Sequence, residues 1–459
     1  MQPRFDLRSY ARDAAREDGT GLCAPGRQVL WREAIEGTVL SGRRALLAGK
    51  SVLIGLSSQF DAALAMLELD GLVARMVITP PDFLGERMAS AIEQAQVDVV
   101  ICDDENKDFG VTVPRFVISP ITRETEAAPP PIETQWVLPT SGTTGAPKLV
   151  AHRLDGLLGA VRPRAAAEPA PVWATFYDIR RYGGLQIFLR AATSGATLAL
   201  TESDEPLSDH LARMAEAGVT HLSGTPSHWR RLLMNPGAPR IAPKYIRLSG
   251  EIADRAILDN LASFYPDARV VHAYASTEAG VGFEVTDGRA GFPASYLGGV
   301  GDVEMRVIDG SLRLRSRRTA DRYVGRDDLR LADEDGFVDT DDLVEREGDR
   351  FYFKGRRAGT INIGGLKVHP EEVEQVINLH DGVRMSLVKP RRNPITGDLV
   401  IAQVMLKENE VSPERKRSLK DEILGLCKER LERHKIPISI EFVSSLAMSP
   451  GGKLLRGKA

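Results

Sequence analysis

The sequence of 459 residues has no long apolar run, which excludes a membrane-spanning α-helix of ordinary length. Its first 18 residues mix Arg with Asp and lack the apolar core of a signal peptide. The net charge is only −3, and no basic amphipathic stretch stands out. We therefore expect a cytoplasmic protein that binds neither nucleic acid nor a membrane.

Cysteine and histidine are also sparse. The three cysteines, Cys23, Cys102 and Cys427, are odd in number and far apart, which argues against a disulfide framework and favours a reducing compartment. The eight histidines show no metal-ligand spacing, so we expect no zinc site. What remains is an ordinary globular composition, with 42% hydrophobic and 27% charged residues, in a chain long enough for two or three domains.

Apolar segments alternate with amphipathic ones through much of the chain, which predicts βαβ units on parallel sheets. In the first third the pattern predicts strands over residues 51–56, 74–79 and 97–102, with helices over 58–72 and 84–95. A second block predicts strands over residues 197–200, 221–222, 245–248 and 269–272.

The later part of the chain has a different texture. Residues 298–355 are rich in Asp, Gly and Arg and in turn pairs, typical of a small β-rich subdomain. The last hundred residues predict strands over residues 385–389, 400–406 and 439–443, with helices from Pro370 and from Pro413. We expect an α/β protein with a large N-terminal domain, residues 1–356, followed by a small α+β C-terminal domain, residues 357–459.

One loop carries the chemical character of a phosphate site. Residues 139–148 read PTSGTTGAPK and contain Thr140, Ser141, Gly142, Thr143, Thr144, Gly145 and Lys148. Glycines allow the backbone to approach a ligand, hydroxyls donate hydrogen bonds, and the lysine adds a positive charge. The common G-x-x-x-x-G-K-[ST] motif does not fit, because the spacing differs and Leu149 follows the lysine. On spacing alone the loop could equally be a flexible turn. An expected strand before it, residues 135–138, and an expected helix after it, residues 154–161, favour the phosphate site.

Two further segments have both a chemical and an ordinary interpretation. Glu278 follows the expected strand 269–272, where a carboxylate could hold a metal ion beside phosphates, although Thr277 and Glu278 could equally begin a helix. Asp342 could accept hydrogen bonds from a ribose and Arg356 could reach the same sugar, although an acidic surface turn is the simpler interpretation.

Glycine pairs mark the other two segments. Gly364 and Gly365 would allow a narrow ligand to approach the backbone, or would simply form a hairpin turn. Lys453 follows Gly451 and Gly452 near the end of the chain, where a lysine usually belongs to a solvated tail. It could act as a reagent only if the chain carried it to an active site.

Taken in order, these segments resemble those of the acyl-adenylate-forming superfamily, which includes acyl-CoA synthetases, peptide-synthetase adenylation domains and luciferases. The matching motifs are T-S-G-T-T-G-x-P-K, Y-x-x-T-E, T-x-D…G-R, G-G-x-K-V-x-P-x-E-V-E and P-x-G-K. The resemblance covers nearly the whole chain and is firmest over residues 138–456.

The resemblance implies a role for each matching residue. The loop from Thr140 to Gly145, with Lys148, would hold the β- and γ-phosphates of ATP. Thr277 would contact the α-phosphate and Glu278 would hold Mg²⁺. The nucleoside contacts would be Tyr274 and Gly250-Glu251 on the adenine faces, His272 at its edge, and Asp342 and Arg356 on the ribose. Lys453 would bridge the attacking carboxylate and the α-phosphate.

In this family the C-terminal domain is mobile. The resemblance implies that it rotates after adenylation, so that Lys453 leaves and Gly364-Gly365 lines a tunnel for the pantetheine thiol. The family's hinge position, usually Asp or Lys, is Ala358 in this chain, which puts hinge control in question. Asp341, Leu149 and Ala275 stand where glycine is common, and the N-terminal region looks shorter than in fuller members.

The acyl pocket would be lined by Tyr177, Arg181, Tyr182, Gly183, Ala275 and Gly299. Aromatic rings beside Arg180 and Arg181 favour a small aromatic or polar acid over a long alkyl chain. The two arginines could instead face solvent or pair with Asp178.

We therefore expect an AMP-forming ligase that uses ATP, Mg²⁺ and CoA and acts as a monomer or homodimer. One alternative acceptor is the phosphopantetheine of an acyl carrier protein. A second alternative is a catalytically silent binding relative, against which the joint presence of Lys148, Glu278, Asp342, Arg356 and Lys453 argues.

Overall fold

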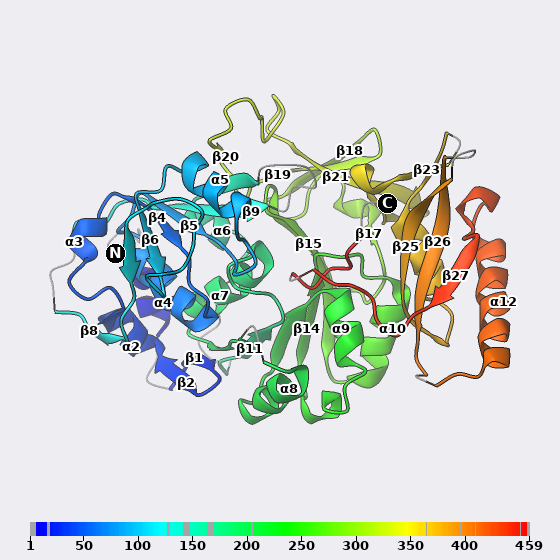
Figure 1. The fold of residues 1–459 in the computed structure, drawn as a ribbon, viewed down its shortest axis with the longest axis horizontal. Helices are drawn as coiled ribbons and strands as arrows, with labels where there is room; N and C mark the ends of the chain where they lie inside the picture. The colour runs from blue at the N-terminus through cyan, green and yellow to red at the C-terminus, as the bar shows by residue number, and fades with distance from the viewer. Residues whose placement is uncertain are drawn as a thin grey trace.

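The computed structural model describes residues 6–15, 19–125, 129–140, 147–162, 169–202, 205–363, 365–393, 397–408, 410–449 and 451–456. Figure 1 shows two sheet-and-helix layers built from the first two thirds of the chain, with the C-terminal elements set against one end. The predicted α/β fold class is confirmed. None of the described helices is both long and apolar enough to cross a membrane.

The largest sheet, which we call the large sheet, supplies one wall of the site. Its strands, in spatial order, are β16 (Gly280–Val285), β15 (Arg269–Ser276), β14 (Tyr245–Ser249), β13 (His221–Gly224), β11 (Val172–Thr175), β12 (Thr197–Ala199), β1 (Gly21–Ala24) and β2 (Arg27–Leu30). The pairs from β15 to β1 are parallel, whereas the edge strands β16 and β2 run antiparallel to their neighbours.

The second sheet holds the predicted phosphate loop. Its order is β20 (Arg322–Val324), β10 (Lys148–His152), β9 (Gln135–Thr140), β5 (Arg75–Ile78), β4 (Ser51–Ile54), β6 (Val99–Cys102) and β7 (Arg115–Val117). A separate two-stranded ribbon joins β3 (Gly37–Thr38) to β8 (Thr122–Arg123). Since β20 pairs with β10, part of the predicted β-rich segment belongs to this sheet.

The prediction that the phosphate loop lies between a strand and a helix is wrong. A strand, a loop and a helix were predicted, but the loop joins β9 to β10 in an antiparallel hairpin, with Lys148 opposite Thr140. The helix that follows, α6 (Leu154–Leu158), begins only after β10. The run Lys148–His152 is short and largely buried, so the pattern is equally that of a strand.

Two smaller sheets follow. The first contains β17 (Phe292–Pro293), β22 (Arg350–Arg356), β21 (Val338–Glu347), β19 (Ser311–Arg315) and β18 (Glu304–Ile308). The C-terminal sheet contains β24 (Leu366–Val368), β23 (Ile361–Ile363), β26 (Gly397–Leu406) and β25 (Val383–Asn393), with β27 (Ser439–Phe442) paired to β26.

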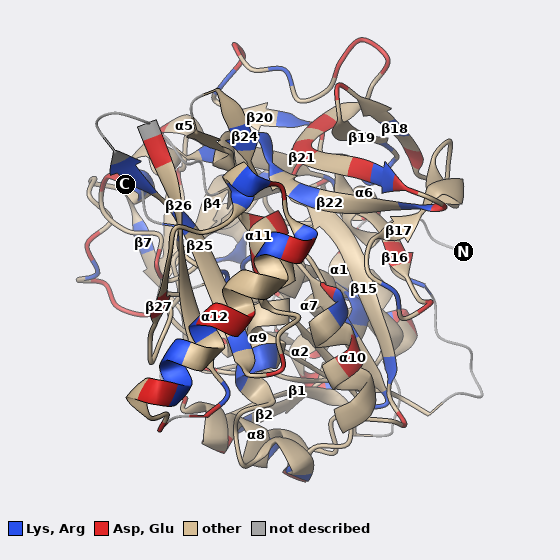
Figure 2. Ribbon diagram, turned by 90° about the vertical axis from the view of Figure 1, so that its right-hand side faces the viewer, with Lys and Arg blue, Asp and Glu red and all other residues tan. Residues whose placement is uncertain are grey.

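The helices cover these sheets. Those of the first two thirds are α1 (Leu7–Ala14), α2 (Trp31–Glu36), α3 (Arg44–Leu47), α4 (Gln59–Leu69), α5 (Glu86–Gln94), α6, α7 (Tyr182–Ser194), α8 (Leu207–Glu216), α9 (Pro226–Leu232) and α10 (Arg255–Phe264). The C-terminal sheet is covered by α11 (Pro370–Ile377) and α12 (Pro413–Arg430). Figure 2 shows that the outer surface of α12 carries charges of both signs, while Leu419, Ile423 and Cys427 are buried beneath it.

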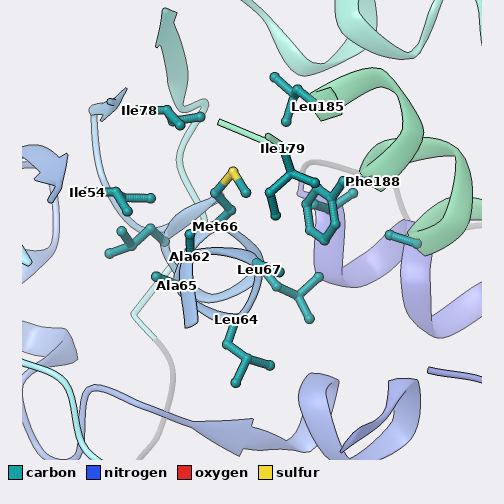
Figure 3. Packing of buried hydrophobic residues seen from close by; sticks show 14 of the residues in the cluster. Ile54, Ala62, Leu64, Ala65, Met66, Leu67, Ile78, Ile179, Leu185 and Phe188 are labelled. Carbon is teal, nitrogen blue, oxygen red and sulfur yellow. The ribbon is translucent and has the colours of Figure 1, made fainter. Parts of the chain in front are cut away.

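The core of the N-terminal region forms around α4. Its sequence is apolar on nearly all sides, as expected for a helix enclosed by two layers. Figure 3 shows Met66 and Leu67 of α4 between Ile54 on one side and Phe188 of α7 on the other. The Ser58 hydroxyl caps the helix by accepting from the backbone N–H groups of Phe60 and Asp61. This packing fixes α7 against the large sheet, which matters for the site below.

Candidate active site

The end of the chain returns to the large sheet. Figure 1 shows the red C-terminal segment running back from β27 towards β14 and β15. Residues around Ser449 and Lys453 form a tight hairpin, in which Met448 pairs with Leu454 and the Ser449 N–H donates to the Lys453 carbonyl at 2.7 Å. Lys453 therefore sits at the tip of a defined turn.

Two side chains of the N-terminal region hold this tip. The buried Thr225 hydroxyl donates to the Gly452 carbonyl at 2.8 Å. The Leu454 N–H donates to Glu251 Oε1 at 3.2 Å, while Glu251 Oε2 accepts from the Ser227 N–H at 2.9 Å. Because Glu251 serves both partners, it ties the start of α9 to the C-terminal tip.

Gly452 lies so close to His228 that no side chain fits there. A Cβ atom at this position would lie 1.8 Å from His228 Cε1, and Gly452 has a φ of +71°. The His228 ring is itself fixed, since it stacks on Phe176 at 5.4 Å and its Nδ1 accepts from the Thr225 N–H at 3.2 Å. The second glycine of the motif is thus required by contact and by backbone conformation.

The Lys453 side chain extends along Gly250, where a Cβ atom would lie 3.4 Å from Lys453 Cε. The side chain still reaches solvent. The surrounding protein and the positive charge of Arg356 lower the pKa of Lys453, whereas Glu251 and Asp342 oppose that shift. An amine with this pattern of neighbours lies among the residues predicted to contact AMP.

The predicted nucleoside residues lie together. The Tyr274 hydroxyl donates to Asp342 Oδ2 at 2.5 Å, and Arg356 Nε donates to Asp342 Oδ1 at 3.3 Å. Register explains this contact, since Asp342 on β21 pairs directly with Arg356 on β22. The Tyr274 ring lies nearly parallel to that of Phe353, with centroids 5.1 Å apart. His272 is turned to the Arg289 carbonyl at 2.9 Å, and burial lowers its pKa.

Glu278 lies in the turn that joins β15 to β16, not at a helix start. Its carboxylate makes no hydrogen bond or ion pair with any described residue, although its charge raises the pKa of Arg356 and Tyr323. Lys148 Nζ lies 5.3 Å from the centre of the Tyr323 ring. The structure therefore brings Lys148 and Glu278 to the same tyrosine from two different sheets.

A magnesium ion fits this arrangement only together with phosphate oxygens. Among the described residues no group of three metal-ligating side chains occurs, so protein oxygens alone would not hold the ion. Glu278 offers one unengaged carboxylate, which suits the coordination of Mg²⁺ between a single protein carboxylate and nucleotide phosphates. Thr277 precedes it, and the buried His152 on β10 lies close to the Thr277 backbone.

Several predicted residues lie outside the described part of the chain or away from the tip. Ser141, Gly142, Thr143, Thr144, Gly145 and Gly364 fall outside the described residues. Gly365 lies in the exposed turn between β23 and β24, as in the simple hairpin interpretation, with its N–H bonded to Asn362 Oδ1 at 3.0 Å. Ala358 lies exposed in a short 3₁₀ turn, Arg357–Gly359, between the small sheet and the C-terminal sheet.

Asp341, which stands where the family often has glycine, has a φ of +59°. This left-handed conformation suits glycine best, and Asp tolerates it better than most residues. The Asp341 carboxylate lies 3.5 Å from Arg357 Nε, directly before the predicted hinge.

The residues predicted for the acyl pocket lie near the ends of β14 and β15. The Tyr177 hydroxyl donates to the Ser249 carbonyl at 2.6 Å, and its ring packs against Gly183. Tyr182 begins α7 and is buried, and Ala275 lies on β15. Gly299 lies in an exposed turn near Val303.

The two arginines that suggested a polar acid are occupied elsewhere. Arg180 is fully buried but pairs with Asp178 at 2.6 Å and donates to the Leu56 and Ser57 carbonyls. Arg181 pairs with Asp82 and lies beside Gly451. The alternative in which Arg180 pairs with Asp178 is the one observed.

Three residues at the site were not predicted from the sequence. Thr225 and His228 begin α9 as a capping pair, and Tyr323 lies on β20. The motif Thr225-Pro226 signals only a helix start, with Pro at its first position. No local pattern marks Tyr323, because its role depends on the pairing of β20 with β10.

Comparison with known proteins identifies the family. A model of AMP-binding enzymes matches residues 39–319, and a model of the C-terminal domain of AMP-binding enzymes matches residues 372–453. The chain therefore belongs to the AMP-binding enzyme family, which confirms the resemblance drawn from the motifs.

Among curated proteins, the chain is similar to a 2-succinylbenzoate–CoA ligase of Salmonella typhimurium, with 26% identity over 82% of this chain and 81% of the relative. It is also similar to a 4-coumarate–CoA ligase-like protein of Oryza sativa, with 25% identity over 82% of this chain and 70% of the relative. A Rhodococcus jostii CoA ligase is 27% identical, with 72% of this chain aligned to 65% of that protein.

Solved structures show the same fold. An anthranilate CoA ligase in complex with anthranoyl-AMP has a TM-score of 0.83 at 18% identity, covering 99% of this chain and 96% of the other. A benzoate CoA ligase from Burkholderia xenovorans has a TM-score of 0.81 at 18% identity, covering 98% of this chain and 99% of the other.

Proposed function

We propose that the protein activates a carboxylic acid with ATP, forming acyl-AMP and pyrophosphate, and then transfers the acyl group to the thiol of CoA. The observation that carries this proposal is the docking of the Lys453 tip on Thr225, Glu251 and Gly250, beside Asp342 and Arg356. A cation held at that position can act on a carboxylate and a phosphate that would otherwise repel each other.

The first half-reaction is a displacement at the α-phosphate. A carboxylate oxygen attacks phosphorus, the bond to the β-phosphate oxygen breaks, and pyrophosphate leaves. Lys453 would lie near both oxyanions and stabilise the charge that develops between them. Lys148 would neutralise the leaving pyrophosphate. These fixed charges need little reorganisation, because Thr225 and Glu251 already hold the tip.

The remaining residues would bind and orient the nucleotide. Asp342 is positioned to accept from ribose hydroxyls, since it already accepts from the Tyr274 hydroxyl at the same site. Arg356 would neutralise nearby phosphate charge, and Glu278 would hold Mg²⁺ against the phosphates. When bound, the metal ion supplies charge neutralisation at the phosphoryl oxygens.

We further propose that residues 1–356 and 357–459 act as two units about Ala358. Lys453 would withdraw for the second half-reaction, and the Gly364-Gly365 segment would approach the site as the path of the thiol. Several of the CoA ligases to which the chain is similar act on aromatic acids by name, 2-succinylbenzoate and 4-coumarate among them. A small aromatic acid is therefore the favoured substrate class.

The test is an assay of pyrophosphate release with a panel of aromatic and aliphatic acids, with ATP and Mg²⁺. We expect release only with particular acids, and a CoA thioester of the accepted acid by mass spectrometry. In a parallel series of assays a phosphopantetheinylated carrier protein replaces CoA. If the thioester forms on the carrier protein and not on CoA, the carrier protein is the acceptor. Absence of acid-dependent pyrophosphate release throughout would contradict the proposal. Omission of Mg²⁺ should abolish release.

A further inference from the structure

A group of polar side chains without partners lies between α7 and the large sheet, behind the predicted acyl pocket. Three buried side chains leave a polar atom without a hydrogen bond in the described structure: Gln186 Oε1, Ser223 Oγ and Arg247 Nη2. Buried polar atoms are normally paired, so three orphans on facing elements call for a ligand or ordered water.

On each element the polar groups share one face. Tyr182, Gln186 and Arg190 are spaced four residues apart on α7 and so share one stripe of the helix. On the large sheet, Arg247 of β14 pairs with Ser223 of β13, so both side chains leave the same face. Arg190 lies within reach of Arg247, since burial and then the positive charge of Arg247 lower the pKa of Arg190.

The charges in this group do not balance. Arg247 Nε donates to Glu284 Oε1 at 3.0 Å, which commits the one nearby carboxylate. The guanidinium of Arg190 makes no hydrogen bond or ion pair with a described residue, and its Nε is buried, although the residue as a whole is half-buried. Arg318 is held by Asp302 and by the Val281 carbonyl at 3.0 Å. Burial would raise the pKa of Glu284, yet Arg247 and Arg190 hold it below its ordinary value. Among the described residues, the Arg190 guanidinium therefore has no carboxylate paired with it.

The position of these groups relative to the reacting end is also defined. Arg247 is two residues before Ser249, which binds Tyr177, or roughly 7 Å along the strand. Arg190 is two helical turns beyond Tyr182, or roughly 12 Å along α7. A group bound by Arg247 would therefore lie farther along β14 than Ser249, on the side away from Gly250 and Lys453.

We propose that Arg190 and Arg247, with Gln186 and Ser223, bind a second carboxylate at the far end of the substrate acid. This inference rests on the proposed function and narrows its substrate class to small dicarboxylic acids with an aromatic or similarly short spacer. Arg190 neutralises the second carboxylate, while the unused Arg247 Nη2 and the two neutral side chains complete its hydrogen bonds. A monocarboxylic acid would leave these groups without partners, so its use as a substrate is disfavoured.

The test compares terephthalate with 4-carbamoylbenzoate, a neutral counterpart of nearly equal size, and with the smaller benzoate. A second set uses 3-phenylpropanoate, 3-(4-carboxyphenyl)propanoate and its neutral 4-carbamoyl counterpart. For at least one set, wild type should favour the dicarboxylate over the neutral counterpart by roughly 10- to 100-fold in kcat/KM, as expected for a charged hydrogen bond. Arg190→Met should remove that preference, and Arg190→Lys should keep part of it. Since the Arg190 guanidinium has no described hydrogen-bond partner, its replacement leaves no described group without a hydrogen bond.

The matched control is Arg255→Met on α10, where the arginine is exposed, which should leave the ratio unchanged. Equal kcat/KM for dicarboxylate and neutral acid in wild type, or an unchanged ratio in Arg190→Met, would overturn the inference while leaving the ligase function intact. If no acid releases pyrophosphate, the proposed function fails instead. Calorimetric titration with both dicarboxylates then tests the proposed carboxylate site without any need for activity. Binding by wild type that is lost in Arg190→Met supports the site. Binding that is absent in wild type, or unchanged in Arg190→Met, overturns it.

Discussion

Lys453→Ala is expected to reduce acyl-AMP formation by about 10²- to 10³-fold, the loss typical of removing one fixed donor to a developing oxyanion. The reason is local, since Lys453 is the cation that the docked tip places beside Gly250, Glu251 and Asp342. The same variant should still convert supplied acyl-AMP and CoA into thioester at nearly the wild-type rate. Separate assays of the two half-reactions measure this difference.

Leu455→Ala provides the control for Lys453→Ala, because Leu455 lies on the same tip with an exposed side chain. It should leave both half-reactions close to wild type. Equal loss of both half-reactions in a Lys453→Ala protein with an unchanged melting temperature would refute the role assigned to Lys453.

Gly452→Ala should slow adenylation by about 10²-fold without removing any reactive group, because displacement of a reacting group by about 1 Å can cost that much. The added Cβ would lie 1.8 Å from His228 Cε1, and alanine is also disfavoured at a φ of +71°. The tip must then leave the Thr225 hydroxyl that holds the Gly452 carbonyl. Thioester formation from acyl-AMP should be spared, since the tip is withdrawn in the second half-reaction that we propose. Pre-steady-state measurement of acyl-AMP formation gives the comparison.

The neighbouring glycine is the matched control. In Gly451→Ala the nearest atom to the new Cβ would be Arg181 Nε at 3.6 Å, an ordinary contact, so adenylation should change little. Combining Gly452→Ala with His228→Ala removes the colliding ring and should recover part of the lost rate. The docking account fails if the two glycine variants behave alike, or if the double variant is no faster than Gly452→Ala.

The sequence predicted the nucleoside part of the candidate site better than the acid part. Tyr274, Asp342, Arg356 and Lys453 come from four distant segments, and the structure places them together as the motifs indicated. The motifs of one family occupy fixed places in its fold, so the closeness of these residues in space could be inferred from the sequence. The hairpin setting of Lys148 could not, because a short buried run after a glycine-rich loop fits a strand or a helix equally well.

The acid part was harder because it depends on which elements face each other. Arg180 and Arg181 are neighbours of aromatic residues in the sequence, yet they pair with Asp178 and Asp82. Arg247 lies in the expected strand 245–248, whereas no helix was predicted around Arg190. An arginine inside the apolar run 245–248 was the available signal, since a buried charge requires a partner. That partner, Glu284, becomes apparent only from the sheet order.

The central claim, that a carboxylate of the substrate attacks the α-phosphate of ATP, is tested most directly with an acid labelled with ¹⁸O in both carboxylate oxygens. Acyl transfer to CoA should leave one ¹⁸O in the released AMP, because the bond from the acid oxygen to phosphorus survives while the acyl–oxygen bond breaks. Mass spectrometry of AMP from a single turnover reads this out. Labelled AMP is the predicted result; unlabelled AMP, or label in inorganic phosphate with ADP formed instead, would contradict the account.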